Sequence, residues 1–282
     1  MFLSSLQRWC RARDPLVAIA VRWGGLTVAY SDRHRRIRYQ TFPSEAQSVT
    51  LPSRCYLDSV ARAARVFIPR AARRCGFSVS GSYAYASTEA PFDAQGMLVA
   101  QTSSSIFDKE GRDLFFTVRM SMARRCRALA ARADLDVDCM THSAVTTFHA
   151  LRALGLFSYA DTIGVIGAES QKICIEEYDR HGWISAQSFA VVDEGSPRAL
   201  AECLCAFLSR RREVGCLVED GGALSRAILK CLSNSSRHLL DIPFGASVEA
   251  FGMSDSGMIT PGILSCIGLL AAHKEWEEGL VV

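Results

Sequence analysis

The chain repeats a short pattern at half its length, and this repeat constrains the fold more than any other feature. Asp32-Arg33-His34, Ile37, Gln40 and Phe42 recur as Asp179-Arg180-His181, Ile184, Gln187 and Phe189, always 147 residues later (179 minus 32). Both copies lie within three β-rich runs separated by turn residues, and a helical stretch and a further strand follow each copy. Such a repeat predicts two related lobes with the same strand order. The Asp-Arg-His segments fall at predicted hairpin tips, where solvated polar residues are expected.

The remaining periodicity predicts an alternating α/β chain. Strands of the two repeated units, which we call meanders, are expected at 16–21, 26–30, 37–42, 163–166, 172–176 and 183–191. Further strands are expected at 77–85, 114–118, 137–140 and 216–219, and helices at 54–66, 121–133, 143–154, 197–211, 224–232 and 261–272. The segment 87–112 is rich in loop residues and shows only weak periodicity.

Composition excludes several classes of protein. Hydrophobic residues make up 49% of the 282 residues, enough to build a core, so extensive disorder is excluded. A membrane-spanning helix needs about 18–20 uninterrupted apolar residues. The best candidate, 259–272, is shorter and contains Thr260, Pro261 and Ser265. The net charge of +3 does not by itself indicate a nucleic-acid-binding protein.

Cysteine and histidine usage predicts free thiols and no metal site. The eleven cysteines include no Cys-x-x-Cys pair, and the closest spacing is Cys203-x-Cys205. No secretory signal is evident, so we expect a reducing, cytosolic environment. His142 and His149 share a helical face and Cys139 precedes His142 by three residues, yet no second such pair completes a four-ligand site. We interpret both histidines as helix-surface residues.

Three parts of the sequence are basic. Residues 1–14 are amphipathic, and three interpretations of them remain open: a partly ordered terminus, a helix packed on the body, or a contact with a membrane surface. Two further stretches are rich in arginine, and three interpretations of them remain open: a solvated surface, a face turned toward an anionic membrane, or a grip on nucleic-acid phosphates. The arginines are Arg62, Arg65, Arg70, Arg73, Arg74, Arg124, Arg125, Arg127 and Arg132.

The later segments narrow the fold. In order, they are Leu129–Leu135 with Val137, Ala144 with Ala150–Leu154, Ile163–Ser170, Val218–Ala223 with its Gly221-Gly222 pair, and Pro261 with Ile267-Gly268-Leu269. In order and spacing they resemble the actin-like ATPase superfamily, and within it PilM and its reduced relative HofM, the cytoplasmic actin-like proteins of type IV pilus assembly. The resemblance covers most of residues 15–273 and is weakest between Ser87 and Arg112. It implies an α/β, duplicated two-lobe actin-like fold.

The resemblance also implies a degenerate nucleotide site. Ala20 and Val165 stand where the family pattern places the two strand acids that handle a metal ion, and Arg22 stands where it places a glycine. Without those acids we expect no ATP hydrolysis, no metal ion and no bound cofactor, with ATP binding as the alternative. Any vestigial nucleotide contact would involve Gly167, Ser170, Gly221 and Gly222. No Gly-x-Ser-x-Gly elbow or complete phosphate-binding loop indicates another enzyme.

We therefore expect three parts along the chain. Residues 1–14 form an N-terminal amphipathic segment, 15–158 the first lobe and 159–282 the second lobe. The first lobe has a core at 15–86 and 141–158 and a small inserted subdomain at about 87–140. The second lobe is reduced, because the stretch between Phe189 and Pro197 is too short for the small subdomain of full-length relatives.

The function that the resemblance implies is a non-catalytic cytoplasmic scaffold, peripheral to the inner membrane, in the assembly platform of a type IV pilus or a related secretion system. The expected partner is the N-terminal cytoplasmic peptide of a PilN-like single-pass membrane protein, with other platform proteins as further partners. The peptide would bind in a groove of the first lobe, between residues 16–42 and the insertion. An active actin-like ATPase and a basic nucleic-acid-binding protein remain the alternatives.

Overall fold

The computed structural model describes residues 16–22, 25–33, 36–43, 53–80, 84–87, 89, 95–102, 114–169, 172–190, 197–209, 214–218, 227–228, 230 and 261–277. The expected amphipathic segment at 1–14 and most of the expected helix at 224–232 lie outside these residues. The described part of the chain contains three β-sheets, of five, four and three strands.

The five-stranded sheet contains the first meander. Its strand order is β3-β2-β1-β4-β8, from β1 (Leu16–Arg22), β2 (Gly25–Ser31), β3 (Ile37–Pro43), β4 (Arg74–Val79) and β8 (Asp136–His142). β1 to β3 pair antiparallel, whereas β4 is parallel to β1 and β8 is parallel to β4. Helices α2 (Arg54–Phe67) and α3 (Met120–Arg132) pack on one face of this sheet through a buried cluster that includes Val17, Ile19 and Val21. β1 is therefore buried on both faces, as central strands of such sheets are.

The four-stranded sheet repeats this topology. Its order is β11-β10-β9-β12, from β9 (Thr162–Glu169), β10 (Lys172–Asp179), β11 (Gly182–Ala190) and β12 (Val214–Val218), with β12 parallel to β9. A shift of 147 residues moves the first three strands onto 163–169, 172–178 and 184–190, within two residues of the observed ones. The repeat is thus confirmed in the strand topology. Helix α5 (Pro197–Ser209) covers one face, where it packs on Ile166, Ile173 and Ile175.

The aspartates of the repeat have the same local role in both copies. Asp32 Oδ1 accepts a hydrogen bond from the Arg36 backbone N–H at 2.9 Å. Asp179 Oδ1 accepts from the N–H groups of His181 and Gly182 at 2.7 and 3.1 Å. Aspartates commonly satisfy turn amides in this way. These residues therefore shape hairpin turns, as the sequence suggested.

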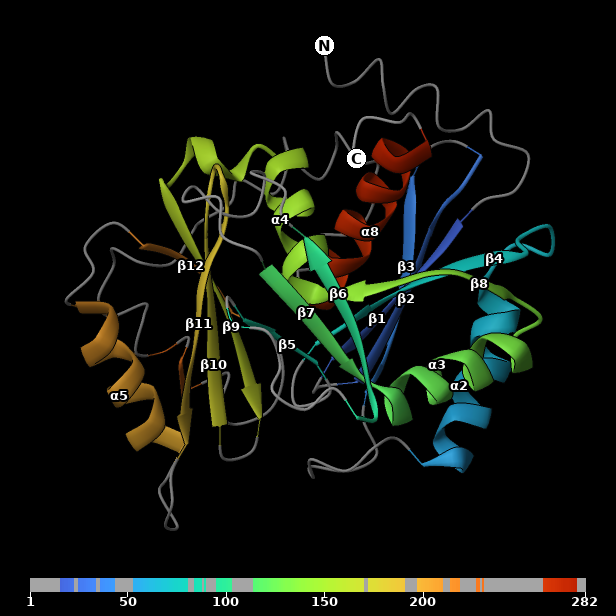
Figure 1. The fold of residues 1–282 in the computed structure, drawn as a ribbon, viewed down its shortest axis with the longest axis horizontal. Coiled ribbons are helices and arrows are strands. Elements are labelled where there is room, and N and C mark those ends of the chain that lie inside the picture. The colour runs from blue at the N-terminus through green and yellow to red at the C-terminus, as the bar shows by residue number, and fades with distance from the viewer. Residues whose placement is uncertain are drawn as a thin grey trace.

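Two buried helices lie between the large sheets (Figure 1). They are α4 (Ser143–Ala153), which is followed by the short η2 (Leu156–Ser158), and α8 (Pro261–Glu277). Their side chains form one core with Leu16, Ala18 and Ala20 of β1 and Ile163 and Val165 of β9. A Cβ added to Gly268 of α8 would lie 1.5 Å from the carbonyl oxygen of Thr146 in α4, so only glycine permits this helix crossing. No described helix meets the length and apolarity needed to cross a membrane.

The three-stranded sheet corrects two sequence predictions. Its order is β5-β7-β6, all antiparallel, from β5 (Ala84–Ser87), β6 (Met97–Thr102) and β7 (Leu114–Arg119). The single strand expected at 77–85 is wrong, because β4 ends at Val79 in one sheet and β5 starts at Ala84 in another. The segment 87–112, expected to be loop-rich, contains β6. β8 belongs to the five-stranded sheet although it lies largely in the range expected for the insertion.

Candidate functional site

A group of polar side chains lies where β1, β10, α4 and α8 meet between the two large sheets. We call Arg22, His142, Glu176, Tyr178 and Ser265 the inter-sheet cluster. Its members come from segments far apart in the sequence: the end of β1, the residue before α4, β10 and α8. Buried polar groups are costly unless they are paired, so their contacts define what this region can do.

Arg22 is the last residue of β1 and reaches α8. Its Nη1 donates a hydrogen bond to Ser265 Oγ at 3.1 Å, and Ser265 is fully buried. The positive charge of Arg22 also acts on the half-buried Glu176 and the buried Tyr178 of β10, and on His142. A single guanidinium from the five-stranded sheet therefore interacts with groups from both sides of the inter-sheet space.

Glu176 and Tyr178 alternate with Ile173 and Ile175 along β10, so they face away from α5. Tyr178 Oη donates a hydrogen bond to Glu176 Oε2 at 2.9 Å. Burial raises the pKa of Glu176, and the charge of Arg22 and the bond from Tyr178 only partly offset this effect. Burial and the neighbouring Glu176 together hold the pKa of Tyr178 well above its usual value, so the phenol keeps its proton.

His142 is the N-cap residue of α4. Its Nδ1 accepts a hydrogen bond from the Ala144 backbone N–H at 2.9 Å, which satisfies one of the unpaired amides at the helix start. Burial lowers the pKa of His142 to about 4, against a smaller opposite effect of its hydrogen bond with the Ala84 backbone, and the charge of Arg22 lowers it further. The neutral imidazole therefore joins β5 to α4 as a structural group.

The position of the histidines corrects the sequence interpretation. His142 and His149 were expected on a helix surface, yet both are buried. The reason is that every residue of α4 from 143 to 151 is buried, against α8 and strands of both large sheets. Within the described ranges, no group of three or more His, Cys, Asp or Glu side chains is arranged to hold a metal ion.

The residues expected at the nucleotide site can be placed only in part. Ala20 and Val165 are both buried in the apolar core between the sheets. Gly167 is buried in β9, opposite Cys174 of β10. Ser170, Gly221 and Gly222 lie outside the described residues. Gly167 is thus the one proposed nucleotide contact that has a described position.

Sequence reasoning missed Glu176, although it pairs directly with Val165 across the β9–β10 ladder. A carboxylate is therefore present on β10, next to β9, where the family pattern places an acid at Val165. It differs from a metal ligand in its surroundings: a tyrosine hydroxyl donates to it and an arginine charge acts on it. Alternation with Ile173 and Ile175 was the only sequence signal, and it is equally typical of a solvated strand face.

The small sheet offers a second candidate surface. Ala84, Phe116 and Val118 on one face are buried in the main cores. On the opposite face Tyr85 and Val99 are 41% and 39% exposed, and Tyr85 Oη donates to Met97 Sδ at 3.0 Å. Tyr85 of β5 and Val99 of β6 each pair with Thr117 of β7, so the three residues share one face of the sheet. Half-exposed apolar side chains on a narrow sheet are a common feature of peptide-binding surfaces.

Comparisons with known proteins place the fold. No protein-family model and no curated protein matches the sequence. A solved type IV pilus biogenesis complex of PilM and PilN matches with a TM-score of 0.59 and 10% identity, over 93% of this chain and 99% of that chain. A Bacteroides thetaiotaomicron protein of unknown function with an actin-like ATPase fold matches with a TM-score of 0.50 and 9% identity, over 86% and 96% of the two chains. The chain has the actin-like ATPase fold, as the sequence predicted.

Proposed function

We propose that this chain is a non-catalytic docking protein in the inner-membrane assembly platform of a type IV pilus or related secretion system. In this role it lies at the cytoplasmic side of the membrane and binds the short cytoplasmic tail of a PilN-like membrane protein. The observation that carries the proposal is the similarity to PilM from the PilM–PilN complex, which extends over 93% of this chain. The sequence resemblance to the same family, through segments spread over 129–269, supports it independently of the strand topology.

The inter-sheet cluster supports the absence of catalysis. Phosphoryl transfer depends on Mg²⁺, which needs oxygen ligands with negative charge. Ala20 and Val165 supply none, and Arg22 contributes a fixed positive charge to the same region. Tyr178 already donates a hydrogen bond to the Glu176 carboxylate, and the charge of Arg22 acts on it. Each of these features opposes metal-assisted ATP hydrolysis.

The small sheet supports a docking role. Among the described residues, β5 and β6 each pair only with β7, which leaves their outer edges able to accept an extended peptide. Such a peptide adds backbone hydrogen bonds at an edge and places alternate side chains on the sheet face. Tyr85 and Val99 give that face apolar character. The expected ligand is therefore an extended tail with alternating apolar residues.

Titration calorimetry of the full chain with the tail peptide tests the proposal. A short peptide loses conformational freedom on binding, so a micromolar Kd, about −8 kcal/mol, is expected. The affinity should be the same with and without ATP and Mg²⁺. Tyr85→Ser should weaken binding, whereas Tyr159→Ser, at a tyrosine 51% exposed after η2, should not.

Two results would overturn the proposal. Absence of binding under both conditions would reject the docking role. Binding that requires ATP would reject the non-catalytic interpretation and return attention to Gly167, Ser170, Gly221 and Gly222 as nucleotide contacts. A tail peptide with its apolar residues replaced by serine is the matched negative control.

A further inference from the structure

The two segments that contain α2 and α3 have a net positive charge, whereas the rest of the chain has a net negative charge. Residues 53–74 and 119–138 contain eleven arginines and four aspartates, a net charge of +7, whereas the whole chain has +3. The rest of the chain therefore sums to −4. We call the exposed surface of these two segments the α2–α3 basic face. In Figure 1 both helices lie at the end of the molecule farthest from the four-stranded sheet.

The two helices form one surface because they share a core. Leu57, Val60 and Ala64 of α2 and Cys126 and Leu129 of α3 are buried in the same cluster beneath the face. Side chains on the opposite side of each helix must then point outward together. The basic face is thus a broad surface of two adjacent helices.

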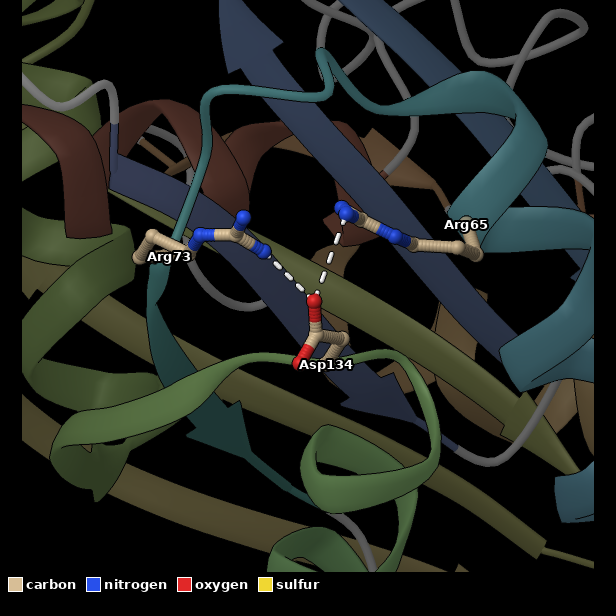
Figure 2. Close-up of polar contacts among 3 residues, drawn as sticks. All are labelled: Arg65, Arg73 and Asp134. Atoms are coloured by element: carbon tan, nitrogen blue, oxygen red, sulfur yellow. Dashed lines mark hydrogen bonds and ion pairs between the residues drawn. The ribbon is translucent and has the colours of Figure 1, made fainter.

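Ion pairs to three of the four aspartates stabilise the edges of this surface. Asp134, which follows α3, forms ion pairs with two arginines (Figure 2). Its Oδ2 lies 3.5 Å from Nη2 of Arg65 in α2 and 2.5 Å from Nη1 of Arg73. Asp58 of α2 pairs with Arg132 of α3, and Asp138 pairs with Arg74 at 2.7 Å. Surface pairs of this kind contribute little stability individually, but here they link α2, α3 and the start of β4. They use four of the eleven arginines.

Six exposed arginines of this face lie outside these ion pairs, and one of them, Arg62, lies one turn before an exposed apolar side chain. They are Arg54, Arg62, Arg70, Arg119, Arg124 and Arg127, and within the described residues none of them forms an ion pair with a carboxylate. Val66, one turn after Arg62 on α2, is 89% exposed, the highest value among the exposed large hydrophobic residues. Arginine side chains around an apolar residue are typical of segments that lie in a lipid headgroup region.

We propose that the α2–α3 basic face binds an anionic phospholipid membrane, with its arginines on the headgroup phosphates and Val66 inserted among them. Each arginine near such a surface contributes about 1 kcal/mol, or about a fivefold change in affinity. A nucleic acid fits less well, because the exposed large hydrophobic residue on this face is a valine and not an aromatic residue on which bases stack. The inference uses only described residues and does not depend on the proposed peptide partner.

Sedimentation with vesicles tests the proposal. The full chain should bind vesicles of phosphatidylglycerol and phosphatidylcholine mixed in about equal amounts, and should not bind phosphatidylcholine alone. The triple variant Arg62→Gln/Arg124→Gln/Arg127→Gln should lose about a hundredfold in affinity. Val66→Ser should lose about fivefold. Binding should weaken as salt is added, since exposed charges are screened within about 8 Å at physiological ionic strength.

A control of equal charge isolates the face. Arg152→Gln/Arg180→Gln/Arg198→Gln removes three exposed arginines from α4, the turn after β10, and α5. Its vesicle affinity should stay within about twofold of the parent, because none of these three arginines belongs to the α2–α3 basic face. Equal losses in the two triple variants, or equal binding to both vesicle types, would overturn the proposal. So would binding of a single-stranded or duplex oligonucleotide without vesicle binding. None of these results bears on the peptide titration, so the two proposals fail separately.

Discussion

Gly268→Ala tests whether the close crossing of α4 and α8 holds the two large sheets together. The added Cβ would lie 1.5 Å from the Thr146 carbonyl oxygen, 2.4 Å from its carbon and 3.0 Å from the Ala150 nitrogen. All three are backbone atoms of a buried helix, so the clash is removed only if the helices move apart. The distance from the Cβ to the Thr146 oxygen must grow from 1.5 Å to at least 3.0 Å, a separation of about 1.5 Å. A gap of that size removes most dispersion contacts across the seam. We expect a loss of about 3 kcal/mol in unfolding free energy, after a gain of about 1 kcal/mol from helix propensity.

Urea unfolding followed by circular dichroism measures this loss. With a slope of about 3 kcal/mol per molar urea, the midpoint should fall by about 1 M. Gly155→Ala is the control, because Gly155 has φ +67° and a Cβ there meets no atom within 4 Å. It should cost only the strain of a left-handed alanine, about 1 kcal/mol. A Gly268→Ala protein as stable as the parent, or more stable, would refute the close crossing.

Three further outcomes follow from the buried groups. The pKa of His142 is about 4 in the folded chain and 6.5 ordinarily, so between these pH values the unfolded chain binds a proton that the folded chain does not. The unfolding free energy should therefore fall by about 3 kcal/mol as pH falls from 6.5 toward 4, and this loss should disappear in His142→Asn. The same dependence of the urea midpoint on pH in the parent and the variant would contradict this. Burial raises the pKa of the Cys126 and Cys266 thiols, so both should react slowly in the folded protein. Alkylation of the native protein, followed by mass spectrometry, should label the exposed Cys203 rapidly and these two only after unfolding. Equal labelling rates would reject the burial of Cys126 and Cys266. Phosphate release from ATP should equal a buffer blank, and turnover abolished by Ser170→Ala would reverse the assignment.

The strand order of both meanders could be predicted because the pattern is local. Each strand is short and bounded by turn residues, and the aspartate that satisfies each hairpin recurs at Asp32 and Asp179. The predicted and observed ends of these strands therefore agree to within three residues. β6 (Met97–Thr102) was missed because its pairing partner, β7, starts twelve residues after the end of β6, and its sequence has no alternation to indicate a strand.

The inter-sheet cluster could not be predicted, for a tertiary reason. Glu176 and Tyr178 alternate with isoleucines, and this pattern gives no indication of whether water or a helix covers the polar face. Here α4 and α8 cover it, and the same burial places His142 and His149 in the interior. Residues 143–151 of α4 are all buried, so spacing alone does not distinguish His142 and His149 from surface residues.

Hydrogen exchange of the full chain, with the tail peptide or with ATP and Mg²⁺, tests the docking proposal most directly because it locates each ligand. The proposal predicts that the peptide slows amide exchange in the small sheet, at Ala84–Ser87 and Leu114–Arg119, and that ATP with Mg²⁺ leaves exchange in β9 and α8 unchanged. Slower exchange around Gly167 with ATP, together with no effect of the peptide on the small sheet, would contradict it.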